Sequence, residues 1–222
     1  MRIRQIVFYI VLCLCLVAGV FIMRSYYSGT VTMRELLTEN KHLKQAITNL
    51  TTEEQIGYAK VISQQMNDGK LFTTIRFVET SRDDNLKKIL EKDYTIEGDI
   101  VYFDALVVKF SDKMVMDGKQ KSLYLWRRVY SEKMAPEAGL SIEEAGTEPH
   151  RYKDILKMLP VKHRDVFWSG IWELANDPDK LAEYGVRAIY GNVLYSQLRK
   201  GFVYVFKITP AGQVYPEVKP EM

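Results

Sequence analysis

The chain has 222 residues and a formal net charge of +3, and 47% of its residues are hydrophobic and 27% charged. This length suits a short anchor plus one domain of ordinary size, and the composition is that of a folded chain rather than a disordered one. The charge is small and evenly spread, without a Lys/Arg-rich stripe carrying interleaved aromatic residues, so we do not expect a nucleic-acid partner.

An uninterrupted apolar run, residues 6–23, comes first and contains no charged residue. About 20 apolar residues cross the hydrocarbon layer as a helix, and the run is longer than the apolar region of most signal peptides. We therefore predict an uncleaved single-pass transmembrane anchor in the cell membrane, with residues 1–5 as a cytoplasmic tail. The following domain would lie outside the cytoplasm, in the periplasm if the cell is Gram-negative. A cleaved signal peptide is the alternative.

The next segment, residues 33–50, repeats apolar side chains at the 3.5-residue period of a parallel coiled coil. Its six seam positions are Met33, Leu36, Asn40, Leu43, Ile47 and Leu50. An asparagine in such a seam selects the register and a two-stranded state. We predict a helical stalk over residues 31–66, with a fresh helix start at Thr51 or Thr52, and a homodimer formed through the seam. The alternative is an amphipathic helix that packs on its own domain.

A folded domain is predicted over residues 70–218. Residues 71–79 are rich in β-branched and aromatic side chains and predict a strand, whereas 81–93 has the spacing of a short helix. Two long apolar runs, 99–110 and 122–130, flank Asp117-Gly118. A two-residue Asp-Gly loop favours a type I′ turn, so we predict a hairpin with Leu106 opposite Val129.

Helical patterns return at 152–159 and 162–175, and Asp177-Pro178 is typical of a further helix start. The chain ends in strand patterns at 186–198, at 202–209 and after the turn at Pro210, where Pro216 indicates an edge strand. The predicted fold class is α+β. It comprises an antiparallel, strongly twisted sheet or half-barrel with inserted helices, preceded by the anchor and the coiled coil.

Motifs of known chemistry are not found in the sequence. The three histidines share no metal-ligand spacing, and no nucleophile elbow, phosphate-binding loop or paired-carboxylate motif occurs. We therefore predict no catalytic residue, no cofactor and no metal, and expect that the protein is not an enzyme. An unrecognised enzyme site in the long loop 134–152, with Glu148 and His150 as acid–base groups, is an alternative.

Aromatic residues are dense in the domain, and some of them stand beside basic ones. Such a surface could bind a protein or a glycan. The candidate binding surface comprises Lys109, Tyr124, Trp126, Arg128, Tyr130, Trp168 and Trp172. The alternative is that these rings fill the core.

The order of anchor, short coiled coil and β-rich extracytoplasmic domain is similar to that of envelope scaffolds such as the elongasome protein MreC, and of pilus-assembly proteins of the inner membrane. The likeness is one of order, and no functional residues carry over. We predict a protein-binding or scaffolding module that contacts an envelope protein. The alternative is a small-molecule or glycan sensor, with a pocket between the long hairpin and the helix of Trp168 and Trp172.

Overall fold

The computed structural model describes Phe8, Leu14 and residues 16–20, 38–144, 149–152, 179 and 186–221. The chain divides into two compact units, Met1–Ile47 and Thr48–Met222. In the first unit, residues 16–20 and 38–47 are helical.

The predicted transmembrane anchor is not supported. Among the described residues there is no helix with the length and apolar character needed to span a membrane. This finding overturns the single-pass anchor, the membrane as a partner and the membrane location with an extracytoplasmic domain. Most of residues 6–23, and all of the tail 1–5, lie outside the described residues.

The predicted coiled coil is also corrected. The described helix covers residues 38–51, and the chain continues as a strand from Glu54, so the stalk does not run to residue 66. Of the six seam residues, Met33 and Leu36 lie outside the described residues, and Asn40, Leu43 and Ile47 are exposed. Leu50 packs against a core cluster of its own unit. Among the described seam residues, only this last one therefore packs against a core cluster, and the predicted coiled-coil dimer is not supported.

The unit Thr48–Met222 is built on two antiparallel sheets. The first has the strand order β3-β2-β1-β8-β9 and the second the order β6-β5-β4-β7. The bounds in the first sheet are β1 Glu54–Asn67, β2 Lys70–Thr80, β3 Lys88–Glu97, β8 Phe202–Ile208 and β9 Val214–Pro220. Those in the second sheet are β4 Ile100–Phe110, β5 Leu123–Ser131, β6 Leu140–Ser141 and β7 Val186–Gln197. Short helices also occur, namely α2 Asp112–Met116 and the 3₁₀ turns Pro136–Ala138 and His150–Tyr152.

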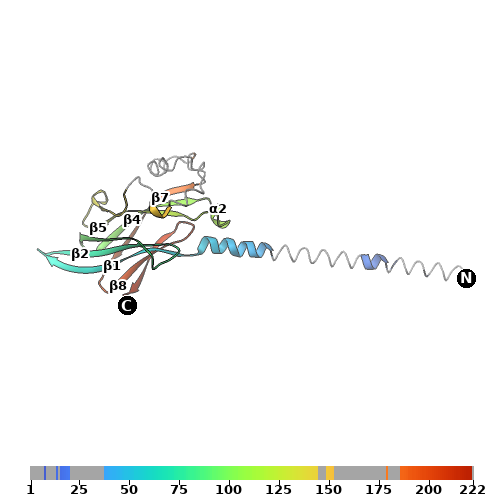
Figure 1. The fold of residues 1–222 in the computed structure, drawn as a ribbon, viewed down its shortest axis with the longest axis horizontal. Coiled ribbons are helices and arrows are strands. Elements are labelled where there is room, and N and C mark those ends of the chain that lie inside the picture. The colour runs from blue at the N-terminus through green and yellow to red at the C-terminus, as the bar shows by residue number, and fades with distance from the viewer. Residues whose placement is uncertain are drawn as a thin grey trace. The chain divides into compact units, whose positions relative to one another are not determined.

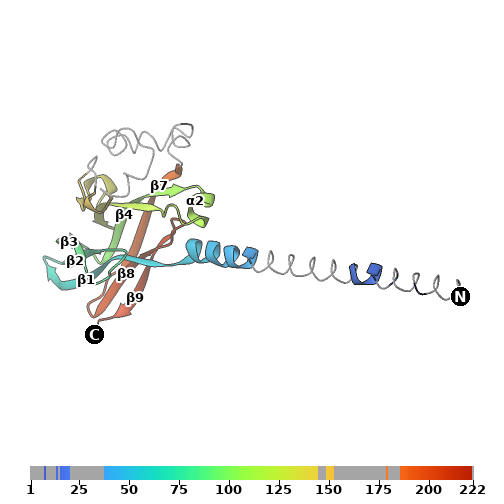
Figure 2. The same ribbon diagram turned by 45° about the vertical axis from the view of Figure 1, so that its right-hand side comes forward.

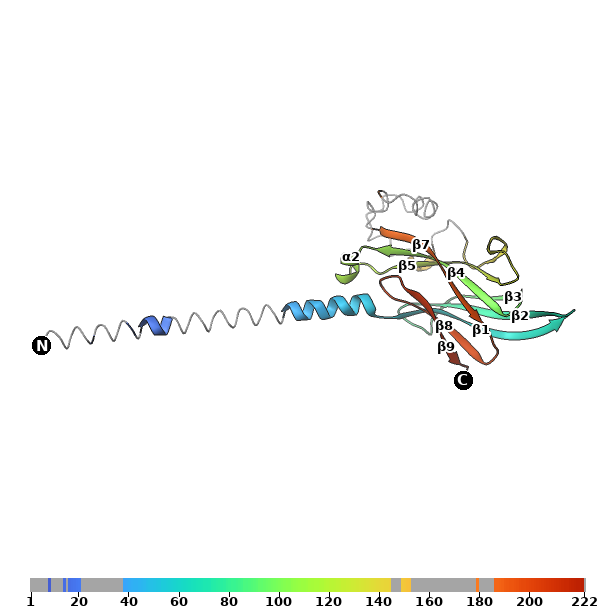
Figure 3. The same ribbon diagram turned by 180° about the vertical axis from the view of Figure 1, so that it is seen from behind.

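The two sheets pack face to face around an aromatic core, and Figures 1 and 3 show them as two layers from opposite sides. At its centre, Phe77 of the first sheet meets Trp126 of the second edge to face, with ring centroids 5.1 Å apart. Phe206 lies 5.2 Å from Trp126 and 4.8 Å from Phe103. Such pairs add to the free energy gained by burying apolar surface, so the aromatic density of the sequence belongs largely to the core.

Strand β1 replaces the helix predicted after Thr51 or Thr52. A β-bulge between Gln55 and Gly57 shifts its register against β8, so the buried side chains Ile56 and Ala59 stand three residues apart. That spacing mimics a helix in the sequence. Gly57 is needed here, because a Cβ at this position would lie 2.6 Å from the carbonyl oxygen of Val78.

Strand β3 likewise replaces most of the helix predicted over 81–93. Its residues pair with β2 along the length of the strand, and Asp93 stands directly opposite Arg76. Tyr94 and Ile96 reach the core. Cross-strand pairing and burial outweigh the local preference of this Lys- and Glu-rich segment for helix.

The hairpin of β4 and β5 is confirmed, but its predicted register is wrong. Leu106 pairs with Leu125 rather than with Val129. The connection holds the one-turn helix α2, which is visible at the end of the hairpin in Figure 2. Gly118, with φ of 68°, follows α2 and its amide bonds to Val115, so Asp117-Gly118 ends a helix instead of making a two-residue turn.

The α+β class is wrong for the described residues, which are mostly antiparallel β-sheet. The strands predicted at 71–79, 186–198 and 202–209 are confirmed, and β9 with Pro216 is an edge strand as predicted. Apart from Tyr152 and Asp179, the helices predicted over 152–184 lie outside the described residues.

Candidate ligand-binding site

The edge of β5 that faces away from β4 is covered by β6 and the backbone amides of Ile142 and Glu143, and beyond them by side chains. β5 pairs with β4 on one side, whereas β6 covers only Arg128 and Val129 on the other. Further along this edge, the Tyr152 hydroxyl accepts a hydrogen bond from the Tyr124 amide (2.8 Å) and donates one to the Tyr124 carbonyl (2.9 Å). Glu143 accepts from the Trp126 amide at 2.7 Å. Polar side chains are therefore brought into the interior at this edge, because buried backbone groups require partners.

Arg151 is the centre of these side chains, and its own side chain is only 8% exposed. Its guanidinium group donates to both carboxylate oxygens of Glu143, at 2.5 and 2.9 Å, and to the Tyr124 carbonyl at 2.7 Å. The Cζ atom lies 4.6 Å from the ring centroid of Tyr124 and 4.7 Å from that of Tyr152. A cation between two rings and a carboxylate is held in one orientation.

Glu79 is a second carboxyl group beside Arg151, and it is 1% exposed. Its Oε1 atom lies 3.0 Å from Arg151 Nη1. Burial raises the pKa of Glu79 from its ordinary value of 4.5 to about 7, with Arg151 opposing the rise and Glu143 adding to it. Burial also raises the pKa of Tyr124 well above its ordinary value. Glu79 therefore exchanges a proton near neutral pH, unlike an exposed glutamate.

A second arginine, Arg82, is held close by in the loop after β2. Its Nε donates to Glu54 at 2.5 Å and its Nη1 donates to the carbonyl of Ser122 at 2.6 Å. Lys121 pairs with the other carboxylate oxygen of Glu54. Two cations thus share one carboxylate, and the guanidinium group of Arg82 is fixed by bonds on two sides.

Buried polar atoms without a hydrogen-bond partner occur in this region. Among the described residues, two such atoms belong to this group of side chains. They are Arg82 Nη2 and Arg151 Nε, whereas Glu79 Oε1 has an ion pair with Arg151 and the Tyr124 hydroxyl interacts with Glu79. A buried donor without a partner costs about 1–3 kcal/mol, so these two guanidinium nitrogens are expected to reduce the stability of this region.

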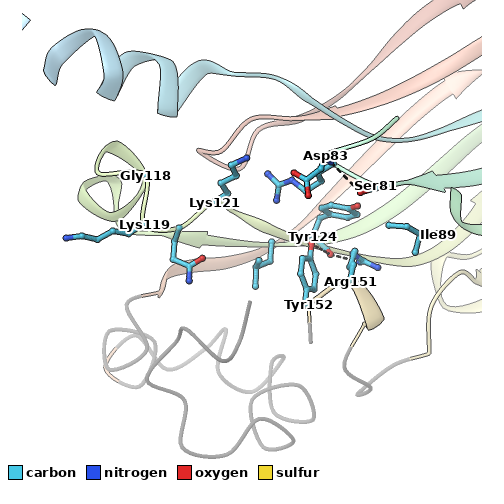
Figure 4. A pocket seen from close by; sticks show the side chains of 12 residues that line it. Ser81, Asp83, Ile89, Gly118, Lys119, Lys121, Tyr124, Arg151 and Tyr152 are labelled. Atoms are coloured by element: carbon cyan, nitrogen blue, oxygen red, sulfur yellow. Dashed lines mark hydrogen bonds between the residues drawn. The ribbon is translucent and has the colours of Figure 1, made fainter. Parts of the chain in front are cut away.

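A cavity of about 390 Å³ adjoins this buried group. Its described lining comes from the loop after β2, the start of β3, the connection between α2 and β5, the start of β5 and the turn at 151–152, as Figure 4 shows for the labelled side chains. Apolar surface is given by Ile89, Leu123 and the rings of Tyr124 and Tyr152. The lining also includes the basic residues Arg82, Lys119, Lys121 and Arg151, the polar residues Ser81 and Gln120, and one acid, Asp83. Mostly apolar walls with a few fixed polar groups are typical of small-molecule sites.

Two of the seven residues predicted to form a binding surface are not on the surface. Tyr124 and Trp126 are fully buried in the core. Arg128 donates to Asp104 at 3.0 Å, and Tyr130 is stacked on Tyr102 with ring centroids 5.0 Å apart. Lys109 is half-buried on β4. Trp168 and Trp172 lie outside the described residues, as does Glu148 of the alternative acid–base pair.

Sequence reasoning missed Glu79, Arg82, Glu143 and Arg151. One signal was available, because the inward positions of β2 fall on Ile75 and Phe77, and the same alternation places Glu79 inward. Burying a carboxyl group is costly unless it has an ion-pair or hydrogen-bond partner, so a glutamate at a core position indicates such a partner or a functional role. The partner, Arg151, is 72 residues away, and nothing in the spacing indicates it.

Metal binding has no support in the described part of the chain, where no three His, Cys, Asp or Glu side chains form a group that could hold an ion. Comparison with models of known protein families, with curated proteins and with solved structures gave no match.

Proposed function

We propose that the unit Thr48–Met222 is a binding module for a small organic molecule, which it takes into the cavity between the loop after β2 and the start of β5. The observation that supports this most is the cavity itself, whose lining combines aliphatic side chains and tyrosine rings with two arginines that carboxylates hold in place. A ligand would cover the apolar walls and meet polar groups whose orientation is already set. The volume of about 390 Å³ is within the usual range of ligand pockets.

Binding fits this geometry better than acid–base catalysis does. Glu79 has a pKa near neutrality, but its side chain is almost fully buried and is not among the residues that line the cavity. A general base must come within hydrogen-bond reach of the proton it removes. The protein-binding role and the enzyme site in loop 134–152 stay predictions.

The test compares two isoleucines that are both 38% exposed, Ile89 in the lining of the cavity and Ile62 on β1. Saturation-transfer NMR would be recorded for the full chain with a panel of small aromatic and aliphatic acids, amides and alcohols. Members of the panel should bind the unmodified protein and Ile62→Trp, and binding should be lost in Ile89→Trp, whose indole fills the cavity. Equal signals from all three proteins, or none from any, would contradict the proposal.

A further inference from the structure

The edge strands of the two sheets, among the described residues, are β3, β9, β6 and β7. Unpaired N–H and C=O groups at an edge can pair with a strand of another chain, and charges or prolines there oppose such pairing. β3 carries five charged side chains among its ten residues, and β9 contains Pro216 and Pro220. β6 is only two residues long, and the Tyr152 hydroxyl covers β5 beyond it. These three edges are therefore poor sites for the addition of a strand.

The edge of β7 lacks these protections. The strand is 12 residues long, Arg187 is its only charged residue, and it contains no proline. From Ala188 to Gln197 it pairs with β4 without a register shift, so no bulge turns the edge away. Val193 and Tyr195, on the face of β7 opposite to the core, are 42% and 68% exposed. β7 is therefore a long, regular and nearly uncharged edge strand whose middle is exposed.

The pairing with β4 determines which backbone groups of β7 lie at the edge. The amide of Leu198 donates to the carbonyl of Asp99 at 2.7 Å, and these two residues continue the register of the two strands. In an antiparallel pair, residues that bond to the partner strand alternate with residues whose amide and carbonyl point away from it. The groups that point away from β4 are therefore those of Ile189, Gly191, Val193 and Tyr195.

The side chains of β7 are compatible with a second copy of the same strand. In the antiparallel two-fold register centred on Asn192, Val193 of each copy lies opposite Gly191 of the other, and the two Val193 side chains are diagonal neighbours. Arg187 then lies opposite Gln197 and far from its own copy. No like charges meet in this register, and exposed apolar surface is covered on both copies.

We propose that the protein forms a dimer in which the β7 strands of two copies pair antiparallel about a two-fold axis, so that their second sheets become one continuous sheet. Such an interface uses the unprotected edge of both copies, and the protected edges keep the assembly from growing further. The dimer does not involve the segment 33–50. It also lies at the opposite edge of the second sheet from the cavity beside β5, so it is independent of the proposed binding of a small molecule.

Sedimentation equilibrium of the full chain over a range of concentrations measures the dimer. We expect Val193→Lys to raise its dissociation constant about tenfold or more, because two lysines would become diagonal neighbours in the interface. The matched control is Ile62→Lys on β1, where the isoleucine is 38% exposed, and it should leave the dimer unchanged. Val193→Pro removes an amide that points away from β4, so it should abolish the dimer while urea denaturation shows the fold retained.

Cross-linking tests the register of the two strands. The chain's own cysteines, Cys13 and Cys15, are first replaced by serine. Asn192→Cys then places the thiols of the two copies opposite each other across the axis, at a pair that is not hydrogen-bonded, and should give a disulfide-linked dimer on mild oxidation. Ser196→Cys is the control, since Ser196 is also half-buried on β7 but would lie opposite Ala188, and it should not cross-link.

Three results would overturn the proposal. One is a monomer at every concentration, and another is a dimer that Val193→Lys and Ile62→Lys affect equally. The third is a dimer that the Val193 variants dissociate but that Asn192→Cys cross-links no better than Ser196→Cys, because the strands would then not pair in the two-fold register. None of these results bears on the cavity, which Ile89→Trp tests separately.

Discussion

Arg76 and Arg151 each form ion pairs with two carboxylates, but Arg76 is partly exposed to solvent and Arg151 is buried. Arg76 lies on the outer face of the first sheet, 38% exposed, with two bonds of 2.8 Å to Asp93 and a contact of 3.2 Å to Glu91. Arg151 is 8% exposed and lies between two tyrosine rings. Water can replace any partner that Arg76 loses, whereas the partners of Arg151 have no substitute. Ion pairing on the outer face needs no functional explanation, but the buried group does.

The largest effect is expected from removing the buried cation. Arg151→Met keeps much of the side-chain volume but leaves Glu143 and Glu79 facing each other without a positive charge. Breaking a buried pair in this way costs about 3–5 kcal/mol of unfolding free energy, which urea denaturation of the full chain would measure. Arg76→Met is the matched control and should change stability little, because its carboxylates become solvated. If Arg151→Met and Arg76→Met lose similar amounts of unfolding free energy, the proposed difference between buried and exposed ion pairs is wrong.

Glu79 should make stability depend on pH in an unusual direction. Its pKa is raised to about 7 in the folded protein, so between about pH 4.5 and pH 7 the folded state holds a proton that the unfolded state has lost. The contribution of Glu79 to stability is therefore greatest at the acid end of this window and falls as the pH rises through it. Relative to Glu79→Gln, which cannot ionise, the protein should lose about 3 kcal/mol between about pH 4 and pH 8.

Glu91 provides the opposite case on the outer face. The hydrogen bond with Lys88 lowers the pKa of Glu91, so its contribution is present at neutral pH and is lost as the pH falls. Comparison of Glu91→Gln with the unmodified protein should therefore give a slope of the opposite sign. If the unfolding free energies of Glu79→Gln and of the unmodified protein change in parallel with pH, the pH dependence assigned to Glu79 is refuted.

A smaller effect is expected at the edge of β5. Tyr152→Phe removes the hydroxyl that accepts from the Tyr124 amide and leaves this buried donor without a partner. The cost should be about 1–3 kcal/mol in urea denaturation. Tyr195→Phe, at a position that is 68% exposed, is the control and should have hardly any effect. If Tyr152→Phe also leaves the unfolding free energy unchanged, the Tyr124 amide finds another hydrogen-bond acceptor, and the role assigned to the Tyr152 hydroxyl is wrong.

The sequence was informative where each strand kept its alternation. The strand at 71–79 and those at 186–198 and 202–209 could be recognised because a half-buried strand alternates strictly. It misled where a bulge broke the alternation, as in β1, and where cross-strand pairing overrode local helix preference, as in β3. Asp117-Gly118 was ambiguous, since a glycine with positive φ serves a helix end as well as a hairpin turn.

The candidate site was largely hidden from the sequence for a different reason. It brings together Glu79 at the end of β2, Glu143 after β6 and Arg151 in a separate turn. Their meeting depends on how the two sheets face each other and on how little of the β5 edge is covered by β6. Only the inward position of Glu79 could be read in advance, and that indicates a buried carboxyl group without naming its partner.

The central claim, that the cavity beside the buried charges takes a ligand, is tested most directly by mapping the site. Methyl groups of isoleucine and leucine would be labelled in the full chain and their NMR shifts followed during titration with the same panel of small acids, amides and alcohols. The account predicts saturable shifts for Ile89 and Leu123, which line the cavity, and none for Ile62 on β1. Shifts at Ile62 with Ile89 and Leu123 unmoved, or no shifts at all, would contradict it.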